Sequence, residues 1–286
     1  MPGKRVLVSG SDGRIGRATV AELKAQGYEV TPADLKATQP WGTQIVDFTD
    51  LSQVLGVMRG QDAVIHLAAI PSPDAHTAEV VFRTNVISTF NVLEAAMILG
   101  IGNITMASSI SALGYAFRHR PFNPHYLPID EAHPLLSQDC YGLSKMIGEE
   151  LAEGYLRRTP DMSLASLRFT AVLDESSQAW LPQARAEPTD DVSTYGAFWT
   201  FVDVRDAALA CRLAMEYEAP GHEAFYICAP IIYRSDDIRD LMARHFAGDY
   251  PIADHIRGRV SPVDSGKAER LLGWRARYNW DGAPFA

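Results

Sequence analysis

The chain has 286 residues, of which 47% are hydrophobic, and its formal net charge at pH 7 is -9. This apolar content can bury the core of one large domain with a smaller appended lobe. The acidic balance argues against nucleic acid and against an anionic membrane surface as partners.

Short apolar runs alternate with longer helical patterns through the first two thirds of the chain. The β-branched and aliphatic runs predict strands over Lys4–Ser9, Tyr28–Asp34, Gln44–Asp47, Asp62–Leu67, Ile104–Ser108 and Leu164–Phe169. Apolar residues at helical spacing predict helices over Arg14–Gln26, Leu51–Met58, Thr77–Leu99 and Tyr141–Arg157. Strands that alternate with helices form βαβ units, so we expect an α/β fold with a doubly wound parallel sheet of the Rossmann type.

The alternation breaks after the sixth predicted strand. The segment Asp174–Ala197 contains serines, prolines and acidic residues without a period, which predicts a loop-rich insertion. Regular patterns return with a helix over Asp203–Met215 and a strand over Ala224–Cys228. A further helix is expected over Ser235–His245, with Ser235 as its N-cap.

One uncharged segment and the cysteines bear on the location of the protein. Ala95–Phe117 has no charge over about 23 residues, a length that can span a bilayer. Its internal glycines and serines instead favour a helix end, a turn, a buried strand and a polar loop. The apolar run Val6–Val8 is too short for a signal peptide. Cys140, Cys211 and Cys228 form no C-x-x-C pair, so we expect reduced thiols, no structural zinc and a cytoplasmic protein.

The junction between the first predicted strand and the first predicted helix is rich in glycine. Gly10, Gly13 and Gly16 give the spacing G-x-x-G-x-x-G. Glycines at such a junction allow a tight turn and a close approach of the backbone to a pyrophosphate, and the helix N-terminus supplies free N–H groups and a partial positive charge. An ordinary glycine-rich turn is the alternative, but the position between strand and helix favours a dinucleotide site.

Asp34 ends the second predicted strand, 18 residues after Gly16. A carboxylate at this position accepts hydrogen bonds from both ribose hydroxyls and repels a 2′-phosphate, so NAD is favoured over NADP. Lys36 lies close enough in the sequence to keep NADP open. A simple turn residue is the alternative interpretation of Asp34.

Tyr141 and Lys145 are four residues apart and therefore share one face of the predicted helix. A phenol has a pKa near 10, which is too high for a base at neutral pH. A nearby ammonium and a positive nicotinamide stabilise the phenolate, and lowering the phenol pKa by about 3 units needs roughly 4 kcal/mol. A Tyr-x-x-x-Lys pair also occurs by chance. The nucleotide site that precedes it favours a catalytic acid/base.

Ser109 follows the fifth predicted strand, where its hydroxyl can hydrogen-bond a reacting oxygen. Ser108 and Ser111 compete for this role. A Pro-rich loop carries three histidines whose spacing matches no zinc pattern, so we expect a solvated loop and no metal site. These are His119, His125 and His133.

Taken together, these residues resemble the extended short-chain dehydrogenase/reductase superfamily, and within it the NAD-dependent epimerase/dehydratase branch. The resemblance covers nearly the whole chain, and the layout is similar to that of compact uronate dehydrogenases, although their substrate-binding positions do not map cleanly here. Besides the glycine motif, it rests on ordered segments that are similar to family motifs: Val46-Asp47-Phe48, His66-Leu67-Ala68-Ala69, Thr84-Asn85-Val86, Ala107-Ser108-Ser109, Tyr141-Gly142-Leu143-Ser144-Lys145, Leu167-Arg168-Phe169 and Asp264-Ser265-Gly266-Lys267-Ala268.

The resemblance implies a set of site residues. Tyr141 would be the general base or acid, Lys145 would bind the nicotinamide ribose and lower the Tyr141 pKa, and Ser109 would orient the substrate. The implied NAD contacts are Gly10, Asp12, Gly13, Arg14, Ile15, Gly16, Asp34, Asp47, Phe48, Leu67, Ala68, Ala69, Asn85, Ala107, Tyr141, Lys145 and Phe169. Substrate contacts are expected from Ser109, Ser111 and Trp199. Family members commonly form homodimers through the helices that correspond to Thr77–Leu99 and Tyr141–Arg157.

Two departures from the nucleotide-sugar enzymes of this branch bear on the substrate. The chain reads Thr170-Ala171-Val172-Leu173-Asp174 in place of their Asn-x-Tyr-Gly-Pro-like stretch, and Phe198-Trp199-Thr200-Phe201 stands where they place an Arg-Asp pair for the nucleotide diphosphate. The chain is also short for that group. A small, unactivated sugar, sugar acid or other hydroxy compound is therefore expected. Further pocket candidates are Trp180, Arg185 and the Phe117–Tyr126 loop.

The sequence thus predicts an NAD-dependent oxidoreductase of carbohydrate metabolism that transfers a hydride between NAD and a hydroxyl-bearing carbon. The alternative is a nucleotide-sugar epimerase or dehydratase that keeps its NAD and returns the hydride. A non-enzymatic, redox-sensing NAD-binding regulator is a third possibility. The expected division is an NAD-binding domain over residues 1–169, which residues 200–230 rejoin, and a small substrate-binding lobe over residues 170–199 and 231–286.

Overall fold

The computed structural model describes residues 3–186, 192–246 and 248–285. Its centre is a seven-stranded sheet in which all neighbouring strands are parallel. In spatial order the strands are β3 (Gln44–Ile45), β2 (Glu29–Asp34), β1 (Arg5–Ser9), β4 (Ala63–His66), β5 (Asn103–Ser109), β6 (Ser163–Phe169) and β9 (Gly221–Ile227). The expected α/β fold class with a doubly wound parallel sheet is confirmed.

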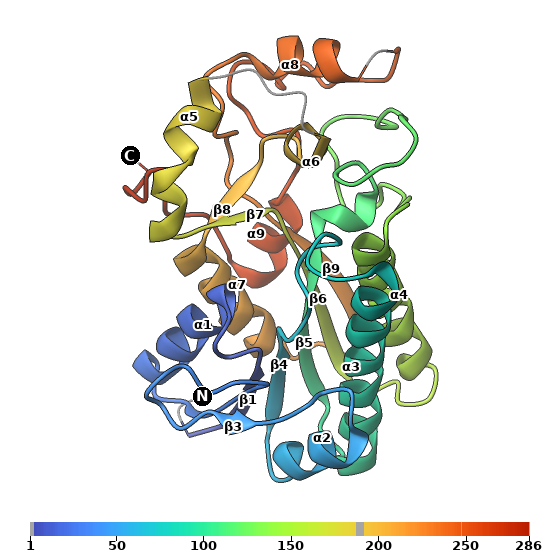
Figure 1. Ribbon diagram of the computed structural model, residues 1–286, viewed down its shortest axis with the longest axis vertical. Coiled ribbons are helices and arrows are strands. Elements are labelled where there is room, and N and C mark those ends of the chain that lie inside the picture. The colour runs from blue at the N-terminus through green and yellow to red at the C-terminus, as the bar shows by residue number, and fades with distance from the viewer. Residues whose placement is uncertain (1–2, 187–191, 247, 286) are drawn as a thin grey trace.

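Helices cover both faces of this sheet (Figure 1). The helices on one face are α1 (Arg14–Ala25) and α7 (Val204–Glu216), and those on the other are α2 (Leu51–Met58), α3 (Ala78–Leu99) and α4 (Cys140–Leu156). Because neither face of the inner strands meets water, the centres of β1 and β4 are apolar runs, and Val6, Leu7 and Val8 of β1 are all fully buried.

The strand order changes direction beside β1. From β1 the chain runs outward to β2 and β3, and then crosses back to β4 on the other side of β1. The connections that leave β1 and β4 therefore diverge at the carboxyl edge of the sheet and leave a crevice there. The glycine-rich turn lies at this edge, between β1 and α1.

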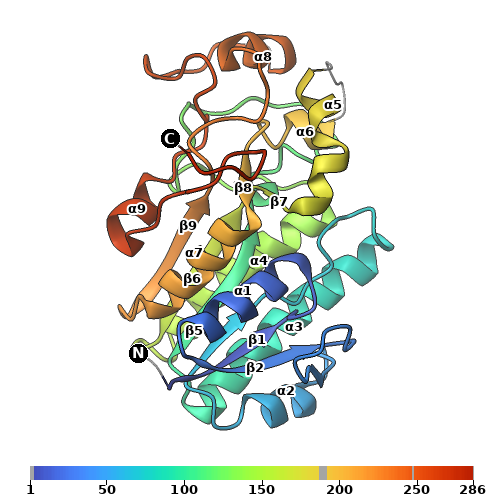
Figure 2. The ribbon, with the colours of Figure 1, turned by 90° about the vertical axis from the view of Figure 1, so that its left-hand side faces the viewer.

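A smaller lobe lies beyond the carboxyl edge of the sheet, at the top of Figures 1 and 2. A two-stranded parallel sheet of β7 (Ala171–Leu173) and β8 (Phe201–Asp203) joins the lobe to the domain of the large sheet. The short helices of the lobe are η2 (Glu175–Ala179), α5 (Leu181–Ala186), α6 (Val192–Tyr195) and α8 (Ile238–His245), while α9 (Gly266–Leu272) packs against β9 and α7. Aromatic side chains fill the lobe: the Phe198 ring stacks on Phe246 at 5.2 Å between centroids.

The structure corrects the predicted start of α8. This helix begins after Asp237, whose carboxylate accepts a hydrogen bond from the Arg239 backbone N–H at 2.8 Å. Asp237 is therefore the N-cap, and the prediction of Ser235 was wrong. The Ser235 hydroxyl instead donates to the Arg185 carbonyl oxygen at 3.4 Å.

The segment expected to be a loop-rich insertion is also corrected in its described part, because it contains η2, α5 and α6. A capping box formed by Asp174 and Ser177 starts η2, a local signal that apolar periodicity does not register. Strand β9 begins at Gly221, three residues before its predicted start, because it pairs with β6 from Ser163 onward. The other predicted bounds lie within two residues of those observed.

Candidate active site

A long cleft opens at the crevice beside β1. It comprises two adjoining cavities, of about 580 Å³ and about 420 Å³, whose shared walls are Gly10, Gly13, Leu67, Ala69 and Pro71. The larger one, called here the β5 cavity, reaches the end of β5 and the start of α4. The smaller one, called the β2 cavity, reaches the end of β2. Such an elongated cleft at the carboxyl edge suits a ligand with two ends, as a dinucleotide is.

The glycine-rich turn between the two cavities has no room for side chains. Gly10 has a φ of +65°, and a Cβ added there would lie 2.7 Å from the Ala68 backbone nitrogen. A Cβ on Gly16 would collide with the carbonyl oxygen of Gly10. The N-cap residue Gly13 has no side chain that could accept hydrogen bonds from the first N–H groups of α1. These groups are therefore left to a ligand. This cradle fits the pyrophosphate of a dinucleotide.

Asp34 lies on the wall of the β2 cavity beside the glycine-rich turn. Its carboxylate accepts hydrogen bonds from the Asp12 backbone N–H at 3.0 Å and from the Leu35 backbone N–H at 2.7 Å. These bonds fix the carboxylate on the wall of the β2 cavity. Lys36 lines the same cavity.

Asp12 tethers the loop after β2. Its carboxylate accepts hydrogen bonds from the Thr38 and Thr43 hydroxyls, both at 2.8 Å, and from the Gln39 backbone N–H at 3.1 Å. Burial by itself would raise the Asp12 pKa, but the hydrogen bonds from Thr38 and Thr43 outweigh it and lower the pKa to about 2. Asp12 therefore stays ionised and shapes the β2 cavity through this loop.

Ser9 fixes the backbone on the β4 side of the cleft. Its hydroxyl oxygen accepts hydrogen bonds from the Leu67 N–H at 3.0 Å and the Ala68 N–H at 3.1 Å. The same oxygen lies 2.7 Å from Nδ1 of His66, whose pKa burial lowers to about 3. His66 is thus a neutral, structural residue that helps to set the wall formed by Leu67, Ala68 and Ala69.

Ser109, Tyr141 and Lys145 come together on the wall of the β5 cavity. The Lys145 amino group lies 5.7 Å from the centroid of the Tyr141 ring and donates a hydrogen bond to the Ala107 carbonyl oxygen at 2.8 Å. Burial raises the Tyr141 pKa, while a hydrogen bond from Ser109 acts in the opposite direction. Burial lowers the Lys145 pKa to about 8. The trio therefore combines a hydroxyl donor, a buried phenol and an amine of reduced basicity.

The neighbouring serine, Ser108, is engaged elsewhere. Its hydroxyl donates to the Glu149 carboxylate at 2.6 Å, and this carboxylate is paired with Arg168 at 2.7 Å in a buried network. Ser111 lies on the cavity wall, and its backbone N–H donates to the Ser109 hydroxyl oxygen at 3.1 Å. Of the three serines, Ser109 is the one that lowers the Tyr141 pKa.

All but one of the expected cofactor contacts lie on the cleft wall. The exception is Asn85, whose side chain accepts a hydrogen bond from the Ile70 N–H at 2.8 Å and donates to the Ser144 hydroxyl at 3.1 Å. Asn85 thereby braces the loop after β4 against α4. The residues on the wall are Gly10, Asp12, Gly13, Arg14, Ile15, Gly16, Asp34, Asp47, Phe48, Leu67, Ala68, Ala69, Ala107, Tyr141, Lys145 and Phe169.

The expected substrate contact Trp199 is not on the wall of either cavity in the part of the chain that the structure describes. Phe198 and Trp199 have φ values of 56° and 55°, and this left-handed turn buries both side chains in the core of the lobe. Trp180 and Arg185 also lie away from the described wall, whereas Phe117 lines it. Wall residues that the sequence analysis missed include Pro71, Thr170, Ala171, Val172 and Ala197.

Arg14 links the glycine-rich turn to the lobe. Its guanidinium lies 3.0 Å from the Asp174 carboxylate and donates a hydrogen bond to the Val172 carbonyl oxygen at 2.8 Å. The ion pair joins the start of α1, on the wall of the β5 cavity, to the residue that follows β7. It ties the lobe to the sheet domain beside the pyrophosphate cradle.

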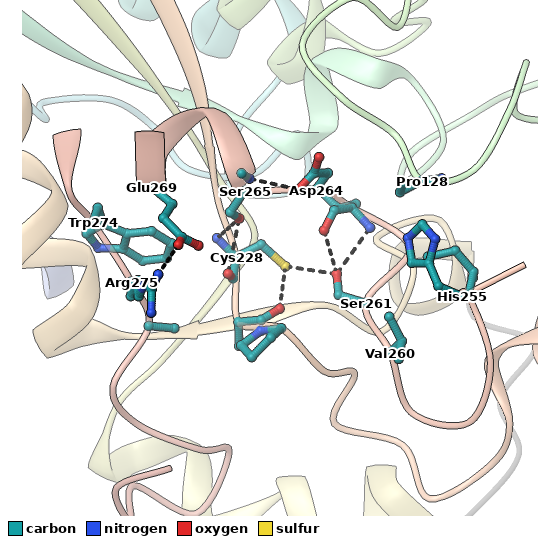
Figure 3. A pocket seen from close by; sticks show the side chains of 16 residues that line it. Pro128, Cys228, His255, Val260, Ser261, Asp264, Ser265, Glu269, Trp274 and Arg275 are labelled. Atoms are coloured by element: carbon teal, nitrogen blue, oxygen red, sulfur yellow. Dashed lines mark hydrogen bonds and ion pairs between the residues drawn. The ribbon is translucent and has the colours of Figure 1, made fainter. Parts of the chain in front are cut away.

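A separate cavity of about 520 Å³ lies between β9, α9 and the preceding loop (Figure 3). Its polar groups bond to one another: the Ser265 hydroxyl bonds to the Cys228 backbone, the Cys228 thiol lies 3.3 Å from the Ser261 hydroxyl, and Glu269 pairs with Arg275. These internal bonds leave it without the convergent polar groups of the cleft. Within the described ranges, no group of three or more His, Cys, Asp or Glu side chains is placed to hold a metal.

A Rossmann-type sheet with a glycine-lined cradle and a Ser–Tyr–Lys group in one cleft defines a dinucleotide-binding protein of the short-chain dehydrogenase/reductase type. The chain belongs to the NAD-dependent epimerase/dehydratase family, whose sequence profile matches residues 6–228. The resemblance inferred from the sequence, NAD as cofactor and the class of NAD-dependent enzyme are thereby confirmed.

Individual proteins extend the comparison. The chain is 32% identical over 165 residues to an L-arabinose 1-dehydrogenase (NAD(P)(+)) of Haloferax volcanii, covering 54% of this chain and 62% of the relative. It is 27% identical over 162 residues to a uronate dehydrogenase of Pseudomonas putida, covering 55% and 57%. A short-chain dehydrogenase/reductase superfamily protein of Agrobacterium tumefaciens, solved with bound NAD, superposes with a TM-score of 0.70 at 25% identity, covering 97% of this chain and 94% of that one. The chain thus matches about three fifths of the length of these two curated relatives.

None of the described helices has the length and apolar character needed to cross a bilayer. The uncharged stretch from Ala95 to Phe117 comprises the end of α3, a turn, β5, the short helix η1 (Ile110–Leu113) and a loop, as expected.

Proposed function

We propose that this protein is an NAD-dependent dehydrogenase that oxidises a hydroxyl-bearing carbon of a small, unactivated compound, foremost a sugar. The observation that carries the proposal is the position of Tyr141. The Tyr141 ring is buried, its centroid lies 5.7 Å from the Lys145 amino group, and Tyr141 shares the wall of the β5 cavity with Ser109 and with Gly10 and Gly13 of the glycine cradle. A proton acceptor, a hydroxyl donor and a cation thus converge where a substrate can meet the cofactor.

In this mechanism the glycine turn and the N-terminus of α1 would hold the pyrophosphate of NAD, Asp34 would accept hydrogen bonds from the ribose hydroxyls, and Lys145 would bind the nicotinamide ribose. Bound NAD supplies the hydride acceptor. Ser109 donates a hydrogen bond to the substrate oxygen, and Tyr141 removes the hydroxyl proton as the carbonyl forms. Because burial raises the Tyr141 pKa, the positive charges of Lys145 and of the oxidised cofactor must stabilise the phenolate.

Packing of the lobe supports an unactivated substrate over a nucleotide sugar. The resemblance places a diphosphate-binding pair of nucleotide-sugar enzymes at the position of residues 198–201. Here Phe198, Trp199 and Phe201 are at most 1% exposed and pack in the apolar core. A diphosphate needs charge-assisted donors, which these side chains lack.

Absorbance of NADH tests the proposal. Purified protein and NAD are mixed with free aldoses, uronic acids, simple alcohols and UDP- or dTDP-sugars. We expect NADH to accumulate with a small unactivated compound and not with nucleotide sugars. Conversion of a nucleotide sugar without NADH, by protein that retains NAD through purification, would instead establish the epimerase or dehydratase.

We also propose that residues 170–199 and 231–286 form the substrate-binding lobe and that residues 1–169 with 200–230 form the NAD-binding domain. The placement of Thr170, Val172 and Ala197 on the β5 cavity supports this division. Chimeras can test it: exchange of the lobe with that of a dehydrogenase of different specificity should change KM for the sugar but not for NAD. A changed KM for NAD alone would contradict it.

A homodimer through α3 and α4 is a further part of the proposal. Large apolar side chains on α3 remain exposed, with Ile87 at 38%, Phe90 at 39% and Ile98 at 54%. Such a surface favours a protein partner over solvent. Light scattering should report a dimer for the wild type and a monomer for Phe90→Asp, and a monomeric wild type would contradict the proposal. A cytoplasmic location stays a prediction.

A further inference from the structure

The β5 cavity has an apolar portion contributed by η1, the loop after it and the lobe. We call this portion the outer chamber, and its walls are Ile110, Ala116, Phe117, Ala171, Val172 and Ala197. Ser111 and Thr170 join Ser109 and Tyr141 as hydroxyl-bearing residues that line the same cavity. The described wall therefore offers a sugar several hydroxyl partners and a large apolar surface.

The cations on this wall are already engaged. Arg14 and Lys145 alone are basic among the described residues that line the β5 cavity. The Arg14 guanidinium is paired with Asp174 at 3.0 Å and bonded to the Val172 carbonyl at 2.8 Å. The Lys145 amino group donates to the Ala107 carbonyl at 2.8 Å, and the mechanism assigns it to the cofactor. These contacts hold the Arg14 guanidinium to the lobe and the Lys145 amino group to the end of β5.

Nearby arginines are held away from the chamber. Arg118 follows the wall residue Phe117, but its guanidinium stacks on the Phe246 ring at 4.8 Å and donates to the Phe122 carbonyl at 3.1 Å. The Arg185 guanidinium stacks on an indole ring, that of Trp280, at 3.7 Å. The residues that the structure leaves undescribed contain no Lys, Arg or His in the sequence. They therefore cannot supply the missing cation.

The aromatic side chains behind the wall of the outer chamber are held in place by packing. Phe198 lies next to the wall residue Ala197, stacks on Phe246 at 5.2 Å and meets Tyr115 edge-on at 5.2 Å. Because these rings are buried and interlocked, a cation cannot enter without unpacking the lobe.

We infer that the substrate is a neutral sugar of pentose or deoxyhexose type, and that anionic sugars such as uronates and sugar phosphates are excluded. This inference rests on the proposed function and narrows its substrate class. A carboxylate that enters the cleft loses hydration, and the two cations on the described wall already have partners within the protein, so little is gained in return. A hydrogen or methyl substituent meets the apolar wall without that penalty, and a hydroxymethyl group lies between these extremes.

A matched series of sugars tests the inference. L-Arabinose, D-fucose, D-galactose and D-galacturonate share one ring configuration and carry hydrogen, methyl, hydroxymethyl or carboxylate at the variable carbon. D-Xylose, 6-deoxy-D-glucose, D-glucose, D-glucuronate and D-glucose 6-phosphate form the same series for the gluco configuration. We expect kcat/KM for the pentose or deoxyhexose to exceed that of the matching uronate at least tenfold. An equal or higher kcat/KM for the uronate would overturn the inference.

A second experiment places a positive charge on the wall of the outer chamber. Ala197→Arg should lower the ratio of deoxyhexose to uronate kcat/KM at least tenfold, because it supplies the missing cation. Ala197→Gln is the matched control, with a long polar side chain but no charge, and should leave the ratio within about threefold. An unchanged ratio in Ala197→Arg, with wild-type NAD affinity showing that it is folded, would count against the inference.

Binding separates this inference from the proposed function. If no sugar yields NADH, the proposed dehydrogenase activity on sugars fails. The same series is then measured by saturation-transfer NMR with the NADH-bound protein, which needs no turnover. Preferential binding of D-fucose or 6-deoxy-D-glucose over the matching uronate would uphold the inference on its own, whereas equal binding, preference for the uronate or no binding would overturn it.

Discussion

Lys145 and Tyr141 lie on the same face of α4, with the lysine nitrogen 5.7 Å from the centroid of the tyrosine ring. Burial opposes the charged form of both groups, because it raises the Tyr141 pKa and lowers the Lys145 pKa to about 8. The fold therefore disfavours the charged form of each group in the place where the proposed chemistry needs it. For Lys145, which is charged at pH 7, this costs stability.

Lys145→Met should stabilise the protein at pH 7. The folded-state pKa of Lys145 lies below its ordinary value of 10.5, so folded protein carries this charge at a penalty below pH 8. Partial solvent access at the cleft reduces that penalty to about 1–2 kcal/mol. As the pH rises from 8 towards 10.5, Lys145 loses its proton in the folded protein before it does so in the unfolded protein. The free energy of unfolding of the wild type therefore increases, and its difference from that of the Met variant shrinks. Urea unfolding of both proteins at pH 7 and pH 9.5 measures this difference in the free energy of unfolding. A difference that does not change with pH would contradict the pKa.

Asp139→Asn should shift the pH dependence of kcat/KM towards lower pH. The Asp139 carboxylate caps α4 by accepting hydrogen bonds from the N–H groups of Tyr141 and Gly142, and its charge raises the Tyr141 pKa. Asparagine keeps the cap and removes the charge. Because the phenolate is the active base, we expect the acidic limb to move down by roughly half a pH unit. Asp139→Ser also provides a neutral N-cap and should shift the acidic limb of the pH profile by a similar amount. An acidic limb at the wild-type pH in both variants would show that the Asp139 charge does not raise the Tyr141 pKa.

Asp34→Ser should weaken discrimination against NADP. The Asp34 carboxylate repels a 2′-phosphate, whereas Lys36 on the same cavity attracts it once that charge is gone. We expect the ratio of kcat/KM for NADP to that for NAD to rise by about 100-fold. Adding Lys36→Gln to Asp34→Ser should cancel most of the gain. A ratio that stays at the wild-type value would show that Asp34 does not select the cofactor.

The sequence predicted the sheet and its flanking helices because their apolar periods are long and match the burial of each element. It also predicted the cleft, since three glycines between strand and helix leave few other conformations. The lobe was harder to predict, because η2, α5 and α6 are too short to show a period.

The directions of individual side chains could not be predicted from the sequence either. Trp199 was expected on the pocket wall, but a left-handed turn that no periodicity reveals buries it in the core. Asn85 was expected at the cofactor, and its side chain bonds the Ile70 backbone and the Ser144 hydroxyl. Thr170 and Val172 were missed as wall residues, although their position directly after β6 places them at the carboxyl edge where ligands bind.

The measurement that tests the central claim most directly compares wild type with Tyr141→Phe in a single turnover, with enzyme in excess over the best sugar and NADH followed by absorbance. Phenylalanine keeps the ring and removes the proton acceptor. We predict NAD affinity within about twofold of wild type and a rate of NADH formation lower by about 10³-fold. An undiminished rate in Tyr141→Phe, at unchanged NAD affinity, would contradict the assignment of Tyr141 as the general base.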